Sequence, residues 1–232
     1  MNTTRNTTRN TTLITPLKKA IIALSAIGLG AFMLGFGLSE STKPTLESTN
    51  QIAPKAQVGQ AAPDFTLSDL DGNELTLSEY TQAGKIVVLE WFSPMCPFVK
   101  KHYRDDTMTM INLQGEFAEE DIVWLRINSA KASHPSAKLK ANQKIANKWG
   151  ITTPILLDPT GEVGKSYGAK RTPEMYIIDA TGTLVYHGAI DNKPDAAQPG
   201  DVNYVQNGLG ELIAGNSISN ATTKAYGCSI KY

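Results

Sequence analysis

A predicted strand that runs directly into a Cys-Pro pair constrains the fold of this chain most. Residues 86–92 read IVVLEWF, a run of β-branched, aromatic and other apolar residues that predicts a strand buried on both faces. The sequence SPMCP follows, and from Pro97 to about Glu119 the pattern becomes helical. The positions of this segment expected to face inward include Phe98, His102, Met110, Leu113 and Phe117. Pro97 suits the first helical position, where a missing N–H costs nothing. We therefore expect Cys96 at a strand-to-helix junction, beside unpaired backbone N–H groups.

This position favours a reactive thiol over an inert buried one. The positive end of a helix dipole stabilises a thiolate, so we expect the Cys96 pKa to fall. Lys100 and Lys101 lie one turn further on and would add positive potential. The alternative is a buried, unreactive cysteine, and the apolar Met95-Cys96 pair is consistent with this alternative.

The remaining pattern predicts a mixed sheet with helices on both faces. Residues 122–129 read as a second buried strand, and residues 139–149 as a helix that ends at Gly150. Short strands follow in PILLD and MYIID, and the turn at residues 180–182 leads into TLVYHG as a hairpin. An amphipathic helix begins near Tyr204. The order is β-α-β-α, then a hairpin, then a helix.

The N-terminal region predicts an export signal or a membrane anchor. Residues 1–19 begin with MNTTRNTTRNTT, which cannot form a core and predicts disorder. Residues 20–38 carry no charge and would span about 28 Å as a helix. An uncleaved inner-membrane anchor is favoured over a cleaved signal, because the apolar run is long and its cleavage site weak. Basic residues precede the run, so the rest of the chain is expected outside the cytoplasm, facing the periplasm. Residues 39–57 read as a linker.

Composition excludes some classes of function. The chain has 22 basic and 22 acidic residues, so no charge imbalance suggests nucleic-acid binding. The three histidines show no metal-ligand spacing with the two cysteines, and neither a metal nor another cofactor is expected. The cysteines lie 132 positions apart, which is no disulfide framework for a small scaffold.

Two long motifs resemble a known family. The sequence VGQAAPDFTLSDLDGNELTLSEYTQAGKIVVLEWFSPMCP resembles the opening of the alkyl hydroperoxide reductase/thiol-specific antioxidant (redoxin) group of the thioredoxin superfamily. The sequence RTPEMYIIDATGTLVYHGAID is similar to the segment that carries that superfamily's cis-proline loop and hairpin. The resemblance implies a thioredoxin-like α/β domain at residues 58–215, followed by a tail at 216–232 that contains Cys228.

The resemblance also implies roles for individual residues. Cys96 falls on the first cysteine of the thioredoxin C-x-x-C motif, and Val99 falls on the second. Thr172-Pro173 matches the cis-proline turn that lies against the reactive sulfur. Glu90 lies where thioredoxins place a buried acid that takes part in proton transfer; the alternative is a strand-end glutamate paired with a lysine.

The chain departs from true peroxiredoxins near the cysteine. Ser93 replaces their threonine, which keeps a hydroxyl able to bind a peroxide, and Leu89 replaces a proline. Their active-site arginine aligns with Pro173; the nearest arginine, Arg171, would either reach the thiolate or be a solvated turn residue. These departures put efficient peroxide reduction in doubt.

Cys228 has two interpretations. As a resolving thiol it would condense with an oxidised Cys96 to form a disulfide. As a tail cysteine it would have no part in the chemistry.

Three functions remain in competition. The leading hypothesis is a thiol-dependent, peroxiredoxin-like antioxidant enzyme in the cell envelope, in which Cys96 attacks a hydroperoxide, Ser93 binds the displaced atom and Pro173 shapes the pocket. An external thiol or Cys228 would regenerate the enzyme. The close rival is a membrane-tethered thiol-disulfide oxidoreductase of the cytochrome-maturation type, acting on a protein disulfide. The third is a non-catalytic binding module.

Overall fold

The computed structural model describes residues 55–232, and its central strand is the predicted buried run. β3 (Ile86–Trp91) is parallel to β4 (Ile122–Asn128) on one side and antiparallel to β7 (Glu174–Ile178) on the other. β4 pairs with every residue of this strand and β7 with Val87 to Trp91, as expected for an apolar central strand. The C-terminal end of β3 therefore lies at the centre of the fold, and Cys96 follows it.

One sheet contains most of the strands. Its order is β2-β1-β5-β4-β3-β7-β8, with β1 (Thr66–Ser68) and β2 (Glu74–Thr76) as an antiparallel pair at one edge. β5 (Ile155–Leu157) is parallel to β4, and β8 (Leu184–Gly188) closes the other edge. A separate two-stranded ladder joins β6 (Arg171–Thr172) to β9 (Cys228–Ser229).

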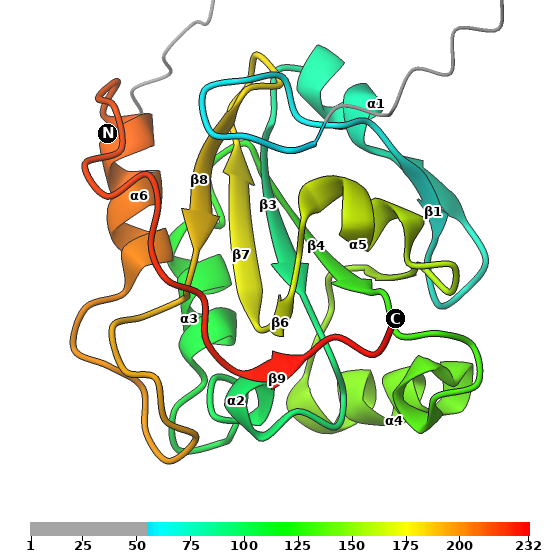
Figure 1. The fold of residues 1–232 in the computed structure, drawn as a ribbon. Helices are drawn as coiled ribbons and strands as arrows, with labels where there is room; N and C mark the ends of the chain where they lie inside the picture. Colours follow the sequence, from blue (N-terminus) through cyan, green and yellow to red (C-terminus); the bar gives the residue numbers. More distant parts are fainter. Residues whose placement is uncertain (1–54) are drawn as a thin grey trace, which may run out of the picture. The chain divides into compact units, whose positions relative to one another are not determined.

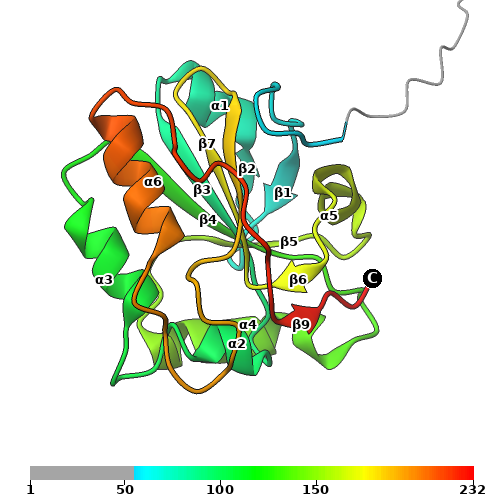
Figure 2. The same ribbon diagram turned by 60° about the vertical axis from the view of Figure 1, so that its left-hand side comes forward.

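Helices cover both faces of the large sheet (Figures 1 and 2). One hydrophobic cluster joins one sheet face to α3 (Thr109–Glu116), α4 (Leu139–Trp149) and α6 (Tyr204–Ile213). The opposite cluster includes residues of α1 (Leu77–Gln82) and α5 (Glu162–Tyr167). Along β3 the side chains alternate between the two: Val88 belongs to the first cluster, Val87 and Leu89 to the second. The mixed thioredoxin-like α/β architecture is confirmed.

The predicted helix from Pro97 to Glu119 is wrong in its middle. α2 (Pro97–Lys100) lasts one turn, and α3 begins only at Thr109 after Met108 adopts a left-handed conformation with φ of 45°. Several positions predicted to face inward do so, including His102, Met110 and Leu113. The sequence therefore indicated the buried residues but not the interruption between the two helices.

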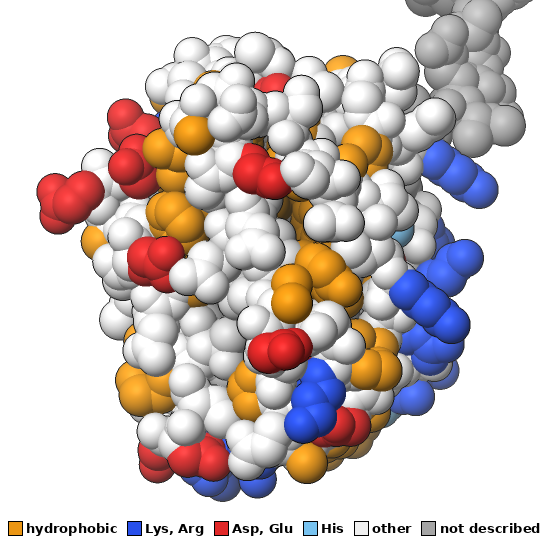
Figure 3. Space-filling view, turned by 90° about the vertical axis from the view of Figure 1, so that its left-hand side faces the viewer, with side chains coloured by type: hydrophobic (Ala, Val, Ile, Leu, Met, Phe, Trp, Pro, Cys, Tyr) orange, Lys and Arg blue, Asp and Glu red, His pale blue; other side chains and the backbone are white. Residues whose placement is uncertain are grey.

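Between β4 and α4 the chain forms one 3₁₀ turn, η1 (Pro135–Ala137). The α6 face shows hydrophobic side chains in separate small groups among polar ones, and Lys and Arg gather toward its right-hand edge (Figure 3).

No helix within residues 55–232 is long and apolar enough to cross a bilayer. The predicted disordered segment and the anchor or signal at residues 20–38 lie outside the described residues, as does most of the linker.

Candidate active site

Cys96 lies at the predicted strand-to-helix junction. It is the N-cap residue of α2 in an extended conformation, and Pro97 is the first helical residue. The side chain is almost completely buried, with 2% of its surface exposed. Its Sγ donates a hydrogen bond to the carbonyl oxygen of Thr172 at 3.0 Å.

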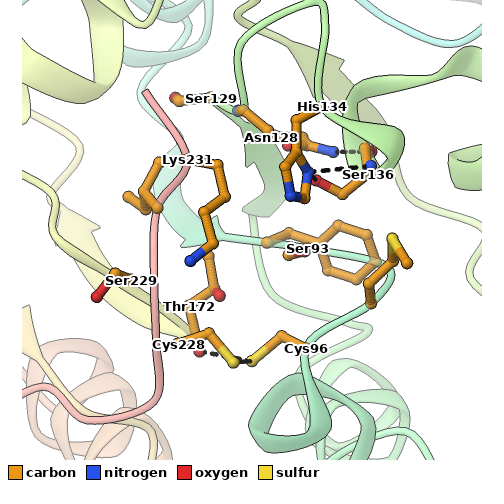
Figure 4. A pocket seen from close by; sticks show the side chains of 14 residues that line it. Ser93, Cys96, Asn128, Ser129, His134, Ser136, Thr172, Cys228, Ser229 and Lys231 are labelled. Atoms are coloured by element: carbon orange, nitrogen blue, oxygen red, sulfur yellow. Dashed lines mark hydrogen bonds between the residues drawn. The ribbon is translucent and has the colours of Figure 1, made fainter.

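Cys228 meets Cys96 directly. Their sulfur atoms lie 2.9 Å apart, and both cysteines are free thiols (Figure 4). A disulfide bond would bring the sulfurs to about 2.05 Å. The two sulfurs therefore need less than 1 Å of approach to form a disulfide.

The ladder between β6 and β9 places Cys228. Thr172 pairs with Cys228 and Arg171 with Ser229 in antiparallel register. The bond between Thr172 and Pro173 is cis, as the resemblance implied. The same Thr172 thus fixes both thiols, one through its carbonyl oxygen and the other through its strand pairing.

Gly227 makes this close approach feasible. Its φ is +111°, and a Cβ at this position would clash with the carbonyl oxygen of Thr172. Glycine adopts a positive φ without a steric penalty, and it has no Cβ that would clash with this carbonyl. The sequence Tyr-Gly-Cys is therefore built to bring the tail against the cis-proline loop.

The Cys228 thiol is a weak acid in this setting. Burial is the largest of the effects that raise its pKa to about 12. The hydrogen bond from Cys96 and the charge of Cys96 raise the pKa further, whereas Lys231 and Arg171 lower it. At neutral pH Cys228 therefore carries its proton.

Glu90 is buried at the end of β3 in a pairing the sequence did not predict. Its carboxylate accepts a hydrogen bond from the Tyr103 hydroxyl and lies 3.5 Å from Nε of Arg126, so its partner is an arginine rather than a lysine. Burial raises the Glu90 pKa against the opposing effects of Arg126 and Tyr103. Its Oε1 has no hydrogen-bond partner among residues 55–232.

The other predicted residues divide between the site and its rim. Ser93 lines the cavity beside the thiols, and its backbone carbonyl accepts from the Cys96 N–H at 3.2 Å. Arg171 is exposed, and its guanidinium donates to the Ser229 hydroxyl at 3.0 Å rather than to Cys96. Val99, at the position of the second C-x-x-C cysteine, is fully buried.

A buried polar cluster anchors the tail just before Cys228. The Tyr226 hydroxyl donates to Asp191 and lies 3.2 Å from Nε2 of His102. The Lys101 ammonium lies 3.5 Å from Asp191 and 4.6 Å from the centre of the Tyr226 ring. Lys101 is completely buried and its ammonium is paired with Asp191, while its expected contribution to the potential at the Cys96 thiol stays a prediction.

The sequence did not reveal this cluster. A Lys-His pair in a predicted helix and a tyrosine in a distant tail share no local period. The one available signal was Asp191, an acidic residue directly after the apolar end of the hairpin.

A cavity of about 190 Å³ opens beside the two sulfurs. Figure 4 shows both thiols on its wall, with His134 and Lys231 on other sides. Fourteen residues line it, and none is acidic. Among residues 55–232 no group of three His, Cys, Asp or Glu is placed to hold a metal ion.

Comparison with known proteins identifies the family. Residues 58–187, more than half of the chain, match the AhpC/TSA family. The chain belongs to this family. The matched segment contains Cys96 and Pro173 but ends before the tail, so Cys228 lies outside it.

The curated relatives include thiol-disulfide oxidoreductases. The protein is 32% identical over 127 residues to the thiol-disulfide oxidoreductase ResA of Geobacillus thermodenitrificans, a match that covers 55% of this chain and 66% of ResA. It is 31% identical to the thioredoxin-like protein YneN of Bacillus subtilis, covering 55% of this chain and 69% of YneN. The match to ResA thus spans slightly less than two thirds of that protein.

A solved structure matches over a larger part of the chain. It belongs to an uncharacterized conserved protein from Geobacillus kaustophilus, with 29% sequence identity and a TM-score of 0.67. The match covers 76% of this chain and 92% of that protein. The thioredoxin-like fold is therefore shared over nearly all of the described region.

Proposed function

We propose that this protein is a thiol-disulfide oxidoreductase whose redox couple consists of Cys96 and Cys228. The contact between the two sulfurs at 2.9 Å carries the proposal, because two thiols so close within one chain can form a disulfide with little movement. The tail thereby supplies the second thiol that Val99 cannot supply from within α2. The names of the relatives support the same class of reaction.

The reaction proceeds by two thiol-disulfide exchanges. The Cys96 thiolate attacks one sulfur of a substrate disulfide, forms a mixed disulfide, and releases the other half as a thiolate that takes up a proton. The Cys228 thiolate then attacks Sγ of Cys96 and releases the second half as a thiol. Two protein thiols are oxidised to one disulfide, and one substrate disulfide is reduced to two thiols.

The surrounding residues position these atoms. The Thr172 carbonyl accepts a hydrogen bond from the resting Cys96 thiol, and Pro173 shapes the loop that presents this carbonyl. Ser93 and the N-terminal turn of α2 lie where a departing sulfur would be held. Glu90, buried and with a raised pKa, is the internal group that we assign to proton transfer. An external thiol would reduce the disulfide again.

Disulfide exchange fits better than the peroxide reduction favoured by the sequence alone. Arg171, the arginine nearest in sequence to the peroxiredoxin position, donates a hydrogen bond to Ser229 on the tail. The relatives named above are disulfide oxidoreductases or thioredoxin-like. The apolar segment at residues 20–38 supports placing this chemistry outside the cytoplasm, on a membrane-tethered or exported domain.

Mass spectrometry of the full-length reduced chain tests the proposal. Wild type, Cys96→Ser and Cys228→Ser each receive one equivalent of a small disulfide, and parallel samples receive hydrogen peroxide. We expect the wild type to lose both thiols to an internal disulfide, Cys228→Ser to retain a mixed disulfide on Cys96, and Cys96→Ser to react slowly. Faster oxidation by peroxide than by the disulfide would instead favour a peroxidase, and an unmodified Cys96 with both oxidants would reject both functions.

A further inference from the structure

We propose that the cavity beside Cys96 and Cys228 takes a small, carboxylate-bearing thiol or disulfide rather than an extended polypeptide. This inference rests on the proposed function and names the substrate class of the same site. It follows from what already occupies the edge of β6, from the size of the cavity, and from the charges around it.

The protein's own tail occupies the backbone edge beside the thiols. An extended peptide would bind next to Cys96 by adding a strand to β6, using main-chain hydrogen bonds. β9 already pairs with β6 at both of its residues. A polypeptide substrate would therefore have to displace the tail that carries Cys228.

The tail is held along its length, so displacement is costly. The Thr223 N–H donates to the His187 carbonyl at 3.0 Å, and Tyr226 is bonded to Asp191. At the C-terminal end, the Lys231 carbonyl accepts from the Lys131 N–H at 2.8 Å, and the Tyr232 hydroxyl donates to the Ala169 carbonyl at 2.8 Å. These contacts lie on both sides of β9, and all would be strained or lost if the strand moved away.

The cavity is the route that remains, and it is small. Its volume of about 190 Å³ is below the roughly 300–1,000 Å³ of pockets for drug-sized ligands. Phe92, Ala130 and Ile230 give it apolar walls, and both sulfurs are on its surface. It has room for one half of a small aliphatic disulfide.

The polar groups of the cavity suit an anion. Lys231 and His134 line it, no lining residue is acidic, and Lys231 is exposed without an ion pair among residues 55–232. Thr172 is only 3% exposed, and its buried Oγ1 has no hydrogen-bond partner among the described residues. Because this oxygen has almost no accessible surface, the preference for an anion rests on Lys231 and on the absence of acidic residues from the lining.

Three small disulfides of similar size but different charge test whether the cavity selects an anion, once their intrinsic reactivity is corrected for. The full-length reduced protein is mixed with 3,3′-dithiodipropionate (anionic), 2-hydroxyethyl disulfide (neutral) or cystamine (cationic), and formation of the Cys96–Cys228 disulfide is followed. Each rate is divided by the rate of the same disulfide with free 2-mercaptoethanol. We expect the normalised rate to decrease in the order anionic, neutral, cationic. The Lys231 charge should favour the anionic disulfide by roughly two- to fivefold in rate, as for an exposed charge pair.

Variants in the tail provide the matched control. Lys231→Gln should remove this preference, Lys231→Arg should keep it, and Lys224→Gln, an exposed lysine of the same tail that does not line the cavity, should leave it unchanged. The preference in the wild type should also shrink at high salt. Insulin, as a polypeptide disulfide normalised in the same way, should react more slowly than dithiodipropionate.

The outcomes separate this inference from the proposed function. Equal normalised rates for the three small disulfides, or a faster normalised rate with insulin, would overturn the substrate class while the thiol-disulfide activity stands. Failure of every disulfide to oxidise Cys96 and Cys228 would overturn both.

Discussion

Thr172 holds both cysteines of the site: its carbonyl oxygen accepts a hydrogen bond from Cys96 Sγ at 3.0 Å, and its backbone pairs with Cys228 across the β6–β9 ladder. Thr172, the residue that precedes the cis-proline, therefore aligns two thiols that lie 132 positions apart in the sequence. Changes that loosen the ladder should act on the chemistry of the pair, and the following predictions depend on this relationship.

Replacing Gly227 by alanine should slow disulfide formation. A Cβ would clash with the Thr172 carbonyl, and the positive φ alone costs about 1–3 kcal/mol for a residue other than glycine. We expect the rate of internal disulfide formation, measured by quenched thiol labelling, to fall at least about tenfold. Gly210→Ala is the control, because a Cβ there meets open space in α6 and should leave the rate unchanged. An unaltered rate in Gly227→Ala would show that the tail does not need this close approach.

Replacing Tyr226 by phenylalanine should destabilise the attached tail. The change leaves the buried Asp191 without one of its hydrogen-bond donors, at a cost of about 1–3 kcal/mol in the free energy of unfolding. Urea denaturation measures it. Tyr204→Phe is the comparison, a half-buried tyrosine for which we expect a change within about 0.5 kcal/mol. Equal effects of the two substitutions would argue against an anchoring role for the Tyr226 hydroxyl.

The second exchange step should accelerate with pH. In the dithiol the pKa of Cys228 is raised to about 12; burial, the largest cause, does not depend on Cys96 being a thiol, so in the mixed disulfide too the thiolate fraction should increase about tenfold per pH unit below the pKa. Once a mixed disulfide has formed on Cys96, its release should therefore speed up steadily from pH 7 to pH 9. Stopped-flow detection of the released thiol gives the profile. A rate that levels off below pH 9 would mean that Cys228 ionises much more readily than its surroundings imply.

Acid should weaken the tail anchor through His102. Burial, assisted by the Lys101 charge and opposed by Asp191, lowers the His102 pKa from its usual 6.5 to about 3. Because the unfolded chain takes up this proton first, the stabilisation is present above pH 6.5 and is lost as the pH falls toward 3. Between pH 7 and pH 5 the loss should be about 2 kcal/mol.

The comparison is with His102→Gln, which cannot take up this proton. Urea unfolding at both pH values should show a smaller acid loss for His102→Gln than for the wild type. His134→Gln, at the rim of the cavity, should behave like the wild type. An identical acid response of His102→Gln and the wild type would contradict the assignment.

Local sequence signals predicted the parts of the fold that depend on local order. The apolar run at residues 86–92 became β3, and the helix at residues 139–149 ends as predicted because Gly150 adopts a left-handed conformation that only glycine takes easily. The Cys96 junction was also visible, because a buried strand followed by Cys-Pro has few other interpretations.

Long-range contacts account for what the sequence did not show. The break between α2 and α3 arises where Lys101 and His102 turn toward Asp191, about ninety positions away. The pairing of Cys228 with Thr172 has no periodic signal, since β9 contains only two residues. The sequence left the role of Cys228 open, and the structure places it against Cys96.

Redox titration of the full-length chain tests the central claim most directly. The protein is equilibrated in dithiothreitol buffers of increasing potential, quenched with a thiol-labelling reagent, and examined by peptide mapping. If Cys96 and Cys228 form one couple, both thiols disappear together in a single two-electron transition, and a peptide linking Cys96 to Cys228 within one chain appears. If the two cysteines stay separately labelled at every potential, or if Cys96 pairs only with another chain, the account of a redox couple built from the junction and the tail is wrong.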